Sequence, residues 1–103
     1  MHRFGPIALI LLAACSPQDM ADQVGRRAAE SVVMPVMSTS MPSGLAQAAT
    51  TCIVQNASAA EVQALARDVG VVAGSLTKSN IGTIAARPET QACFAAAGVP
   101  MVG

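Results

Sequence analysis

Ser58-Ala59-Ala60-Glu61-Val62-Gln63-Ala64-Leu65 is the stretch that decides the fold, because it carries the clearest helix signal in the chain. Ser58 followed three residues later by Glu61 is a capping box, in which each side chain bonds the backbone N–H of the other residue. Apolar residues then recur at helical spacing along one face, at Val62, Leu65, Ala66 and Val69. Gly70 is expected to end this helix. The pattern predicts a core built from amphipathic helices.

A second helix is predicted directly before this one, and it places a cysteine on its buried face. The apolar positions follow the i, i+3, i+4, i+7, i+8 spacing of a helix, and they are Leu45, Ala48, Ala49, Cys52 and Ile53. Asn56 is expected to end the helix in a left-handed conformation. The stretch therefore predicts a helix that presents Cys52 to the core.

The C-terminal part predicts one helix clearly and leaves another open. Pro88 suits the first position of a helix that Gly98 ends, and we expect Cys93 and Ala97 on its buried face with Phe94 beside them. Whether residues 71–86 are helical is not decided by the sequence. Val71 and Val72 favour an extended segment, whereas helical spacing over residues 77–86 would turn three side chains inward: Ile81, Ile84 and Ala85.

Cys52 and Cys93 lie on the predicted inner faces of two of these helices, which favours a disulfide between them. Such a bond would stabilise the fold by about 4 kcal/mol in the chain-entropy model. That contribution matters here because much of the 52% apolar content is alanine, which buries little area. Two alternatives stay open: a pair of buried free thiols, or a redox pair, although redox cysteines usually form a C-x-x-C motif.

Residues 17–34 predict a further helix, which begins at Ser16-Pro17-Gln18-Asp19. We expect Pro35 to end it and the residues rich in Met, Pro and Ser at 34–44 to form a flexible linker. Its narrow apolar stripe comprises Met20, Val24, Ala28 and Val32. The helix is interpreted as a spacer next to a membrane, with a partner-binding helix as the alternative.

The first sixteen residues have the layout of a secretory signal. His2 and Arg3 form a short positive region, residues 4–12 are uncharged and mostly apolar, and small residues precede Cys15. The apolar run is shorter than the roughly 20 residues that a membrane-spanning helix needs. An ordinary secretory signal with a coincidental cysteine is the alternative interpretation.

Leu12-Ala13-Ala14-Cys15 resembles the lipobox of bacterial lipoproteins at every position, and the resemblance covers residues 1–16. It implies cleavage between Ala14 and Cys15, and attachment of diacylglycerol and a further acyl chain such as palmitate to Cys15. It also implies a location in the inner leaflet of the outer membrane, facing the periplasm. The outer-membrane location is inferred from Ser16, because Asp at that position is typical of lipoproteins retained in the inner membrane.

Three regions are therefore predicted. Residues 1–14 are a signal peptide that is removed, and residues 15–42 hold the lipidated anchor, the membrane-proximal helix and the linker. Residues 43–103 form the compact domain. We expect an all-α fold of three or four helices clamped by a Cys52–Cys93 disulfide.

Composition argues against several classes of function. The only histidine, His2, lies in the predicted leader, and the chain has no Tyr or Trp. Nucleophile pairs that use histidine and the usual zinc sites are therefore disfavoured, and we expect neither an enzyme nor a cofactor. Balanced charge argues against nucleic-acid binding. The expected partners are the lipid bilayer, through Cys15, and an unidentified envelope protein that contacts alanine-rich helix faces.

Met34, Met37 and Met41 suggest an alternative function. Thioethers are soft ligands that suit Cu(I), so three spaced methionines in a flexible exported segment predict a copper-handling protein of the periplasm. The other interpretation is that these methionines fill gaps in packing.

Overall fold

The structure is a computed structural model that describes residues 17–70 and 72–100. These residues form five α-helices and no strand: α2 (Pro17–Ser38), α3 (Ser43–Gln55), α4 (Ala59–Ala66), α5 (Ser75–Ala85) and α6 (Pro88–Ala97). The expected all-α fold is confirmed. The predicted leader, its cleavage site and Cys15 lie outside the described residues.

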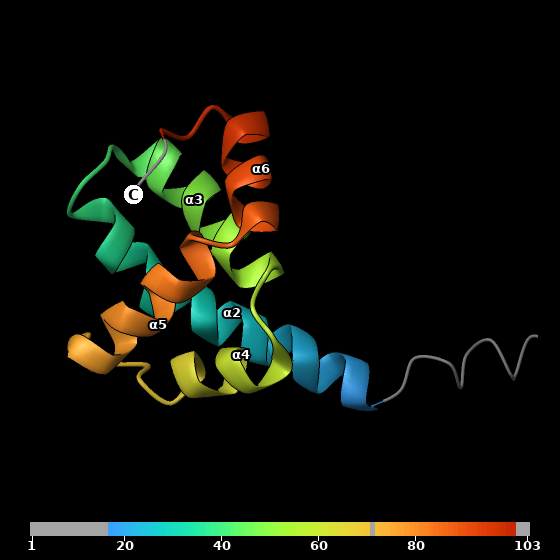
Figure 1. Ribbon diagram of the computed structural model, residues 1–103. Coiled ribbons are helices and arrows are strands. Elements are labelled where there is room, and N and C mark those ends of the chain that lie inside the picture. The colour runs from blue at the N-terminus through green and yellow to red at the C-terminus, as the bar shows by residue number, and fades with distance from the viewer. Residues whose placement is uncertain (1–16, 71, 101–103) are drawn as a thin grey trace, which may run out of the picture.

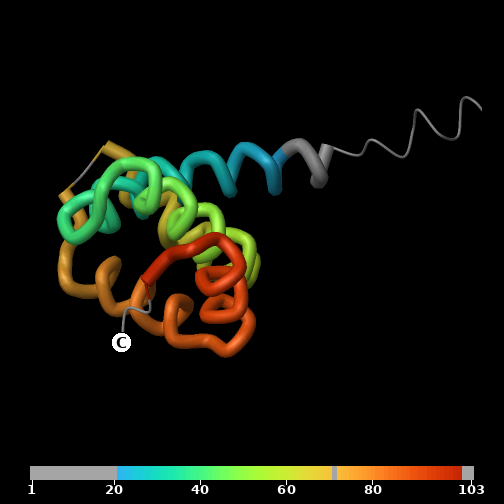
Figure 2. Tube along the Cα trace, turned by 90° about the horizontal axis from the view of Figure 1, so that it is seen from above, coloured from blue at the N-terminus to red at the C-terminus, as the bar shows by residue number. Residues whose placement is uncertain are grey.

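The longest helix, α2, packs against both α3 and α4, and α3 also contacts α5 and α6. In Figure 1, α3 and α6 lie above α2, whereas α4 runs along the lower edge of the molecule. Figure 2 shows the first turns of α2 projecting from one end of this arrangement. The core therefore lies around α3, with α2 extending beyond it.

Pro35 does not end α2, so that prediction is wrong. The helix continues through Pro35 to Ser38, although a proline inside a helix removes a hydrogen bond at a cost of about 3 kcal/mol. The Pro35 side chain is exposed, while Met37 beyond it is 8% exposed and packs in the core. Burial of the residues that follow Pro35 offsets the missing hydrogen bond, and the helix persists.

The expected linker is correspondingly much shorter. Only residues 39–42 separate α2 from α3, and Thr39 and Ser40 donate their N–H groups back to the last turn of α2. The core is not confined to the residues after Ser43, because α2 contributes four buried side chains to it: Ala29, Val32, Val33 and Met37. The helix is thus part of the compact unit and not a separate spacer.

The apolar stripe expected on α2 is only partly confirmed, because Val32 is buried in the core at 6% exposed but the other described positions are not. Val24 is 67% exposed and Ala28 is half-buried, and the side chain of Met20 lies outside the described residues. The buried face passes through Gly25, where an added Cβ would lie 3.5 Å from Val62 Cγ1. This contact with α4 selects a face of α2 that spacing alone did not indicate.

The capping box at the start of α4 is confirmed. Ser58 Oγ accepts from the Glu61 N–H at 3.2 Å, and Glu61 Oε1 accepts from the Ser58 N–H at 2.8 Å. The regular helix ends at Ala66, earlier than expected, and a turn leads to Gly70 at a φ of 81°. Val69 leaves the buried face for this reason and is 50% exposed.

The end of α3 differs from the prediction as well. Asn56 has a φ of −101° and a ψ of 6°, which is not left-handed. Its side-chain amide donates to the Cys52 carbonyl at 2.8 Å, so the helix end is satisfied by a side chain without a positive φ. Leu45 and Ala48 are half-buried, while further positions face the surrounding helices: Ala46, Thr50 and Val54.

Residues 75–85 are helical, and the three residues expected to face inward are buried: Ile81, Ile84 and Ala85. Val72 lies in the connection before α5, and Val71 falls outside the described residues. The last helix has the predicted bounds, Pro88–Ala97, with Gly98 at a φ of 72°. Val99 donates to the Phe94 carbonyl at 2.9 Å, and Gly98 donates to the Ala95 carbonyl at 3.3 Å, which together make a Schellman motif.

Phe94, and not Ala97, is the centre of the buried face of α6. The Phe94 side chain is 1% exposed and Thr90, one turn earlier, is fully buried. Ala97 is exposed, contrary to expectation. Phe94 is the only aromatic residue after the predicted leader, so this one ring fills space that alanines leave open.

Candidate functional site

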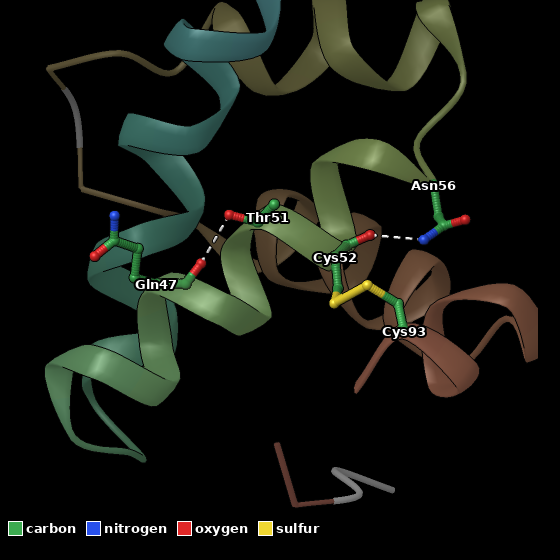
Figure 3. Close-up of a disulfide and its surroundings, with 5 residues drawn as sticks. All are labelled: Gln47, Thr51, Cys52, Asn56 and Cys93. Atoms are coloured by element: carbon green, nitrogen blue, oxygen red, sulfur yellow. Dashed lines mark hydrogen bonds between the residues drawn. A yellow bond between two sulfur atoms is a disulfide. The ribbon is translucent and has the colours of Figure 1, made fainter. Parts of the chain in front are cut away.

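The predicted disulfide is present and joins α3 to α6. Cys52 and Cys93 are bonded, with their Cα atoms 5.6 Å apart, and they are 41 positions apart in sequence. Figure 3 shows the bond crossing from the last turns of α3 to α6. Cys52 is 1% exposed and Cys93 is half-buried. The bond covalently joins α3 to α6 at the residue before buried Phe94.

The backbone around Cys52 is held from both sides. Thr51 donates its hydroxyl to the Gln47 carbonyl at 3.1 Å, and Asn56 donates to the carbonyl of Cys52 itself (Figure 3). These bonds fix the last turn of α3, where the cysteine sits. The disulfide therefore joins a hydrogen-bonded helix end to α6.

An arginine that the sequence did not single out ties three helix ends together. Arg87, the residue before α6, donates to both carboxylate oxygens of Glu61 and to the Asn56 carbonyl at 2.8 Å. Glu61 also belongs to the capping box of α4. The Arg87 guanidinium and these hydrogen bonds hold the pKa of the Glu61 carboxyl at about 2, well below its usual value of 4.5. Charge spacing along the sequence gives no signal for a pair 26 residues apart.

A second arginine anchors α2. Arg26 Nη1 donates to the Val54 carbonyl at 2.8 Å, so a cation meets the carbonyl end of α3. A positive charge at the C-terminal end of a helix is favourable for the helix dipole. This contact and the packing of Gly25 on α4 fix the projecting part of α2 to the rest of the unit.

The three methionines lie against the core. Met37 is buried, and Met34 and Met41 are partly buried against the core cluster. The Met34 sulfur also accepts a hydrogen bond from the Thr50 hydroxyl at 3.6 Å. Met34 and Met37 belong to α2, so the flexible segment on which the copper interpretation rested is not observed. Their contacts are those of side chains that fill gaps in packing.

The connection between α4 and α5 exposes an apolar surface. We define the apolar cap as Val69, Val72 and Leu76, which are 50%, 94% and 86% exposed. Val72 and Leu76 line the same surface hollow of about 730 Å³, whose floor includes Leu65. Val72 and Leu76 share this hollow, and neighbouring large apolar side chains this exposed are typical of interaction surfaces.

The apolar cap adjoins a groove beside the C-terminal turns of α2. This groove of about 440 Å³ lies between Val32, Pro35 and Val36 on one side and Val72 and Ala73 on the other. The Thr77 hydroxyl donates to the Asp68 carboxylate, which joins the turn after α4 to the first turn of α5.

Sequence reasoning missed the apolar cap for a specific reason. Val69 was expected on the inner face of α4, but α4 ends before it. For Leu76 the sequence does carry a signal. Thr77, Ile81 and Ile84 face inward, and Leu76 lies about 100° around the helix from Thr77, so its side chain points away from the core.

The described residues limit the other kinds of site. Among residues 17–70 and 72–100, no group of three or more His, Cys, Asp or Glu is placed to hold a metal ion. Within the same ranges, no helix combines the length and the apolar character needed to cross a bilayer. Comparisons with protein-family models, with curated proteins and with solved structures find no match to this chain.

Proposed function

We propose that this chain is a lipid-anchored lipoprotein of the bacterial cell envelope, whose helical unit acts as a non-enzymatic interaction module. The observation that carries the proposal is the lipobox-like stretch Leu12-Ala13-Ala14-Cys15. Acyl chains on Cys15 would provide the two or more hydrophobic anchors that stable membrane attachment requires. The proposed location is the inner leaflet of the outer membrane, with the helical unit in the periplasm.

The disulfide supports export of the protein. Disulfides persist in oxidising compartments such as the periplasm and are rare in the cytosol. Cys52 and Cys93 are paired in the structure, which leaves Cys15 as the one remaining cysteine of the three in the chain. This pairing is compatible with a Cys15 that carries lipid.

The surface suited to a protein partner is the exposed side of α6. Ala92, Ala95 and Ala96 are exposed there, and small side chains let a partner helix approach closely. In Figure 1, α6 lies on the edge of the molecule opposite α4 and the first turns of α2. A protein tethered through Cys15 would thus present α6 away from its anchor.

The anchor is tested by replacing Cys15 with serine in a bacterium that expresses the full chain. We expect Cys15→Ser to move the protein out of the membrane fraction and to abolish labelling with a radioactive fatty acid. The matched control is Ser43→Ala, at an exposed position of α3, which should change neither. Unchanged membrane retention and labelling of Cys15→Ser would contradict the proposal.

The interaction role is tested with a photo-crosslinking side chain at position 96 in intact cells, compared with one at exposed Asp22 on α2. We expect a discrete protein adduct from position 96 and none from position 22. Equal, diffuse adducts from both positions would contradict the assignment of α6 as the partner surface.

A further inference from the structure

We propose that the apolar cap of Val69, Val72 and Leu76 docks on the bilayer that carries the anchor, so that α2 lies along the membrane surface. This inference rests on the proposed function, because it takes Cys15 as the point of attachment. It goes beyond that function by assigning an orientation to the helical unit and a lipid partner to the cap.

The first step is the length of chain between the anchor and the fold. α2 begins at Pro17, two residues after Cys15. Two residues span at most about 7 Å, so acylation of Cys15 holds the first turn of α2 at the headgroups. The helical unit is therefore tied closely to the bilayer.

The second step is the position of the apolar cap along α2. Val72 lines a groove with Val32 and Pro35 of that helix, about 25 Å from Pro17 at the helical rise of 1.5 Å per residue. An upright α2 would hold the cap that far above the bilayer. An α2 that lies flat brings the cap to the surface.

The third step is the side of the molecule on which these features lie. In Figure 1, the first turns of α2 and the α4–α5 connection both lie along the lower edge, and α6 lies at the upper edge. Figure 2, seen from above, again places both on the side away from α6. The first turns of α2 and the α4–α5 connection can therefore meet one plane together.

The fourth step is the chemistry of the surface. Exposed Arg67 lines the hollow with Val72 and Leu76, and exposed Lys78 lines the groove with Val72. Asp68 lines both, and its carboxylate accepts from the Thr77 hydroxyl. The one ion pair among the described residues is Arg87–Glu61, so neither cation forms a salt bridge there. Apolar side chains bordered by cations suit the interface of a bilayer that contains anionic lipid. Tethering raises the local concentration of the surface, so a weak contact suffices.

Two properties of the chain make this testable. With Cys52 and Cys93 paired, Cys15 is the single thiol of the chain from Cys15 onwards, so it couples selectively to vesicles that contain a maleimide lipid. The chain has no tryptophan, so one introduced tryptophan reports a single position. The vesicles contain phosphatidylcholine and phosphatidylglycerol with brominated or unbrominated acyl chains.

The reporter is Leu76→Trp and the matched control is Ala96→Trp, at an exposed position of α6. We expect roughly twofold quenching of L76W emission by brominated chains, because interfacial apolar groups sit about 5–10 Å into the headgroup boundary. We expect no quenching of A96W. Adding Val72→Asp, at a position 94% exposed, should abolish the quenching of L76W without unfolding the protein.

Unquenched L76W, or quenching that is equal in L76W and A96W, overturns the proposal and leaves the apolar cap to a protein partner. Quenching that survives Val72→Asp also overturns it. Because the coupling is chemical, these outcomes do not depend on lipidation in cells. Failure of the Cys15→Ser experiment would instead contradict the proposed function and leave the vesicle result intact.

Discussion

Arg87 meets Glu61 through two parallel hydrogen bonds, with Nη1–Oε1 at 2.8 Å and Nη2–Oε2 at 2.6 Å. The two residues come from the start of α6 and the first turn of α4. Bidentate pairs of this kind are shorter and stronger than single neutral hydrogen bonds. Because Arg87 also bonds the Asn56 carbonyl, the pair sets the relative positions of α3, α4 and α6.

This pair predicts an acid-sensitive fold. The pKa of Glu61 is lowered from 4.5 to about 2 in the folded protein, so its stabilising contribution is fully present above pH 4.5 and is lost as the pH falls towards 2. We expect the free energy of unfolding to fall by roughly 2 kcal/mol over that range, after allowing for solvent screening. Urea unfolding at a series of pH values measures it.

Glu61→Gln is the variant that isolates the effect. It keeps a side-chain oxygen for the capping box but carries no charge, so the loss of stability between pH 4.5 and 2 should shrink. Exposed Glu89→Gln is the control. An E61Q variant with the pH dependence of the parent would show that another carboxylate is responsible.

The disulfide should carry a large share of the stability. Its closed loop corresponds to about 4 kcal/mol in the chain-entropy model, and the core contains one aromatic side chain, Phe94. We therefore expect reduction, or replacement of Cys52 and Cys93 by alanine, to lower the thermal midpoint by more than 10 °C, at about 4–8 °C per kcal/mol. Circular dichroism on heating, with and without reductant, measures this. The Cys15→Ser protein serves as the control, and an unchanged midpoint after complete reduction would refute the prediction.

Thr90 is a site where a substitution should stabilise the protein. Its side chain is fully buried and its hydroxyl has no hydrogen-bond partner among the described residues. A buried, unsatisfied polar group costs about 1–3 kcal/mol, and valine has the same shape without that group. Thr90→Val should therefore raise the free energy of unfolding by about 1 kcal/mol.

The matched control for Thr90 is Thr83→Val. Thr83 is exposed on α5 and donates its hydroxyl to the Ser79 carbonyl. Removing this hydroxyl should therefore leave the free energy of unfolding unchanged or lower it slightly. Chemical denaturation of the two variants makes the comparison. A destabilised T90V would mean that the hydroxyl is bonded in solution.

Pro35 should be replaceable with a gain in stability. It is exposed within α2 and leaves one helical hydrogen bond unmade. Pro35→Ala should raise the free energy of unfolding by about 2 kcal/mol, which is less than the full helix penalty because proline also restricts the unfolded chain. A loss of stability on thermal unfolding would show that the ring makes a contact the helix needs.

Local signals fixed much of this protein from the sequence alone. The capping box of Ser58 and Glu61, the bounds of α6 and the pairing of Cys52 with Cys93 were all predictable, because each depends on nearby residues or on two cysteines in helices. The lipobox resemblance is a sequence property too, and it stays a prediction. These features need no knowledge of which helix packs on which.

Tertiary packing decided the rest. Pro35 ends a helix by local rules, yet α2 continues because Met37 beyond it is buried. The Glu61–Arg87 pair joins residues 26 positions apart. Val69 belongs to the apolar cap because α4 ends before it, so the Val69 side chain leaves the buried face. Caps and helical periods act over a few residues, whereas burial depends on which faces meet in space. For that reason the sequence by itself determined the start of α4, the bounds of α6 and the disulfide, and only the fold determined where α2 ends and which surface was left uncovered.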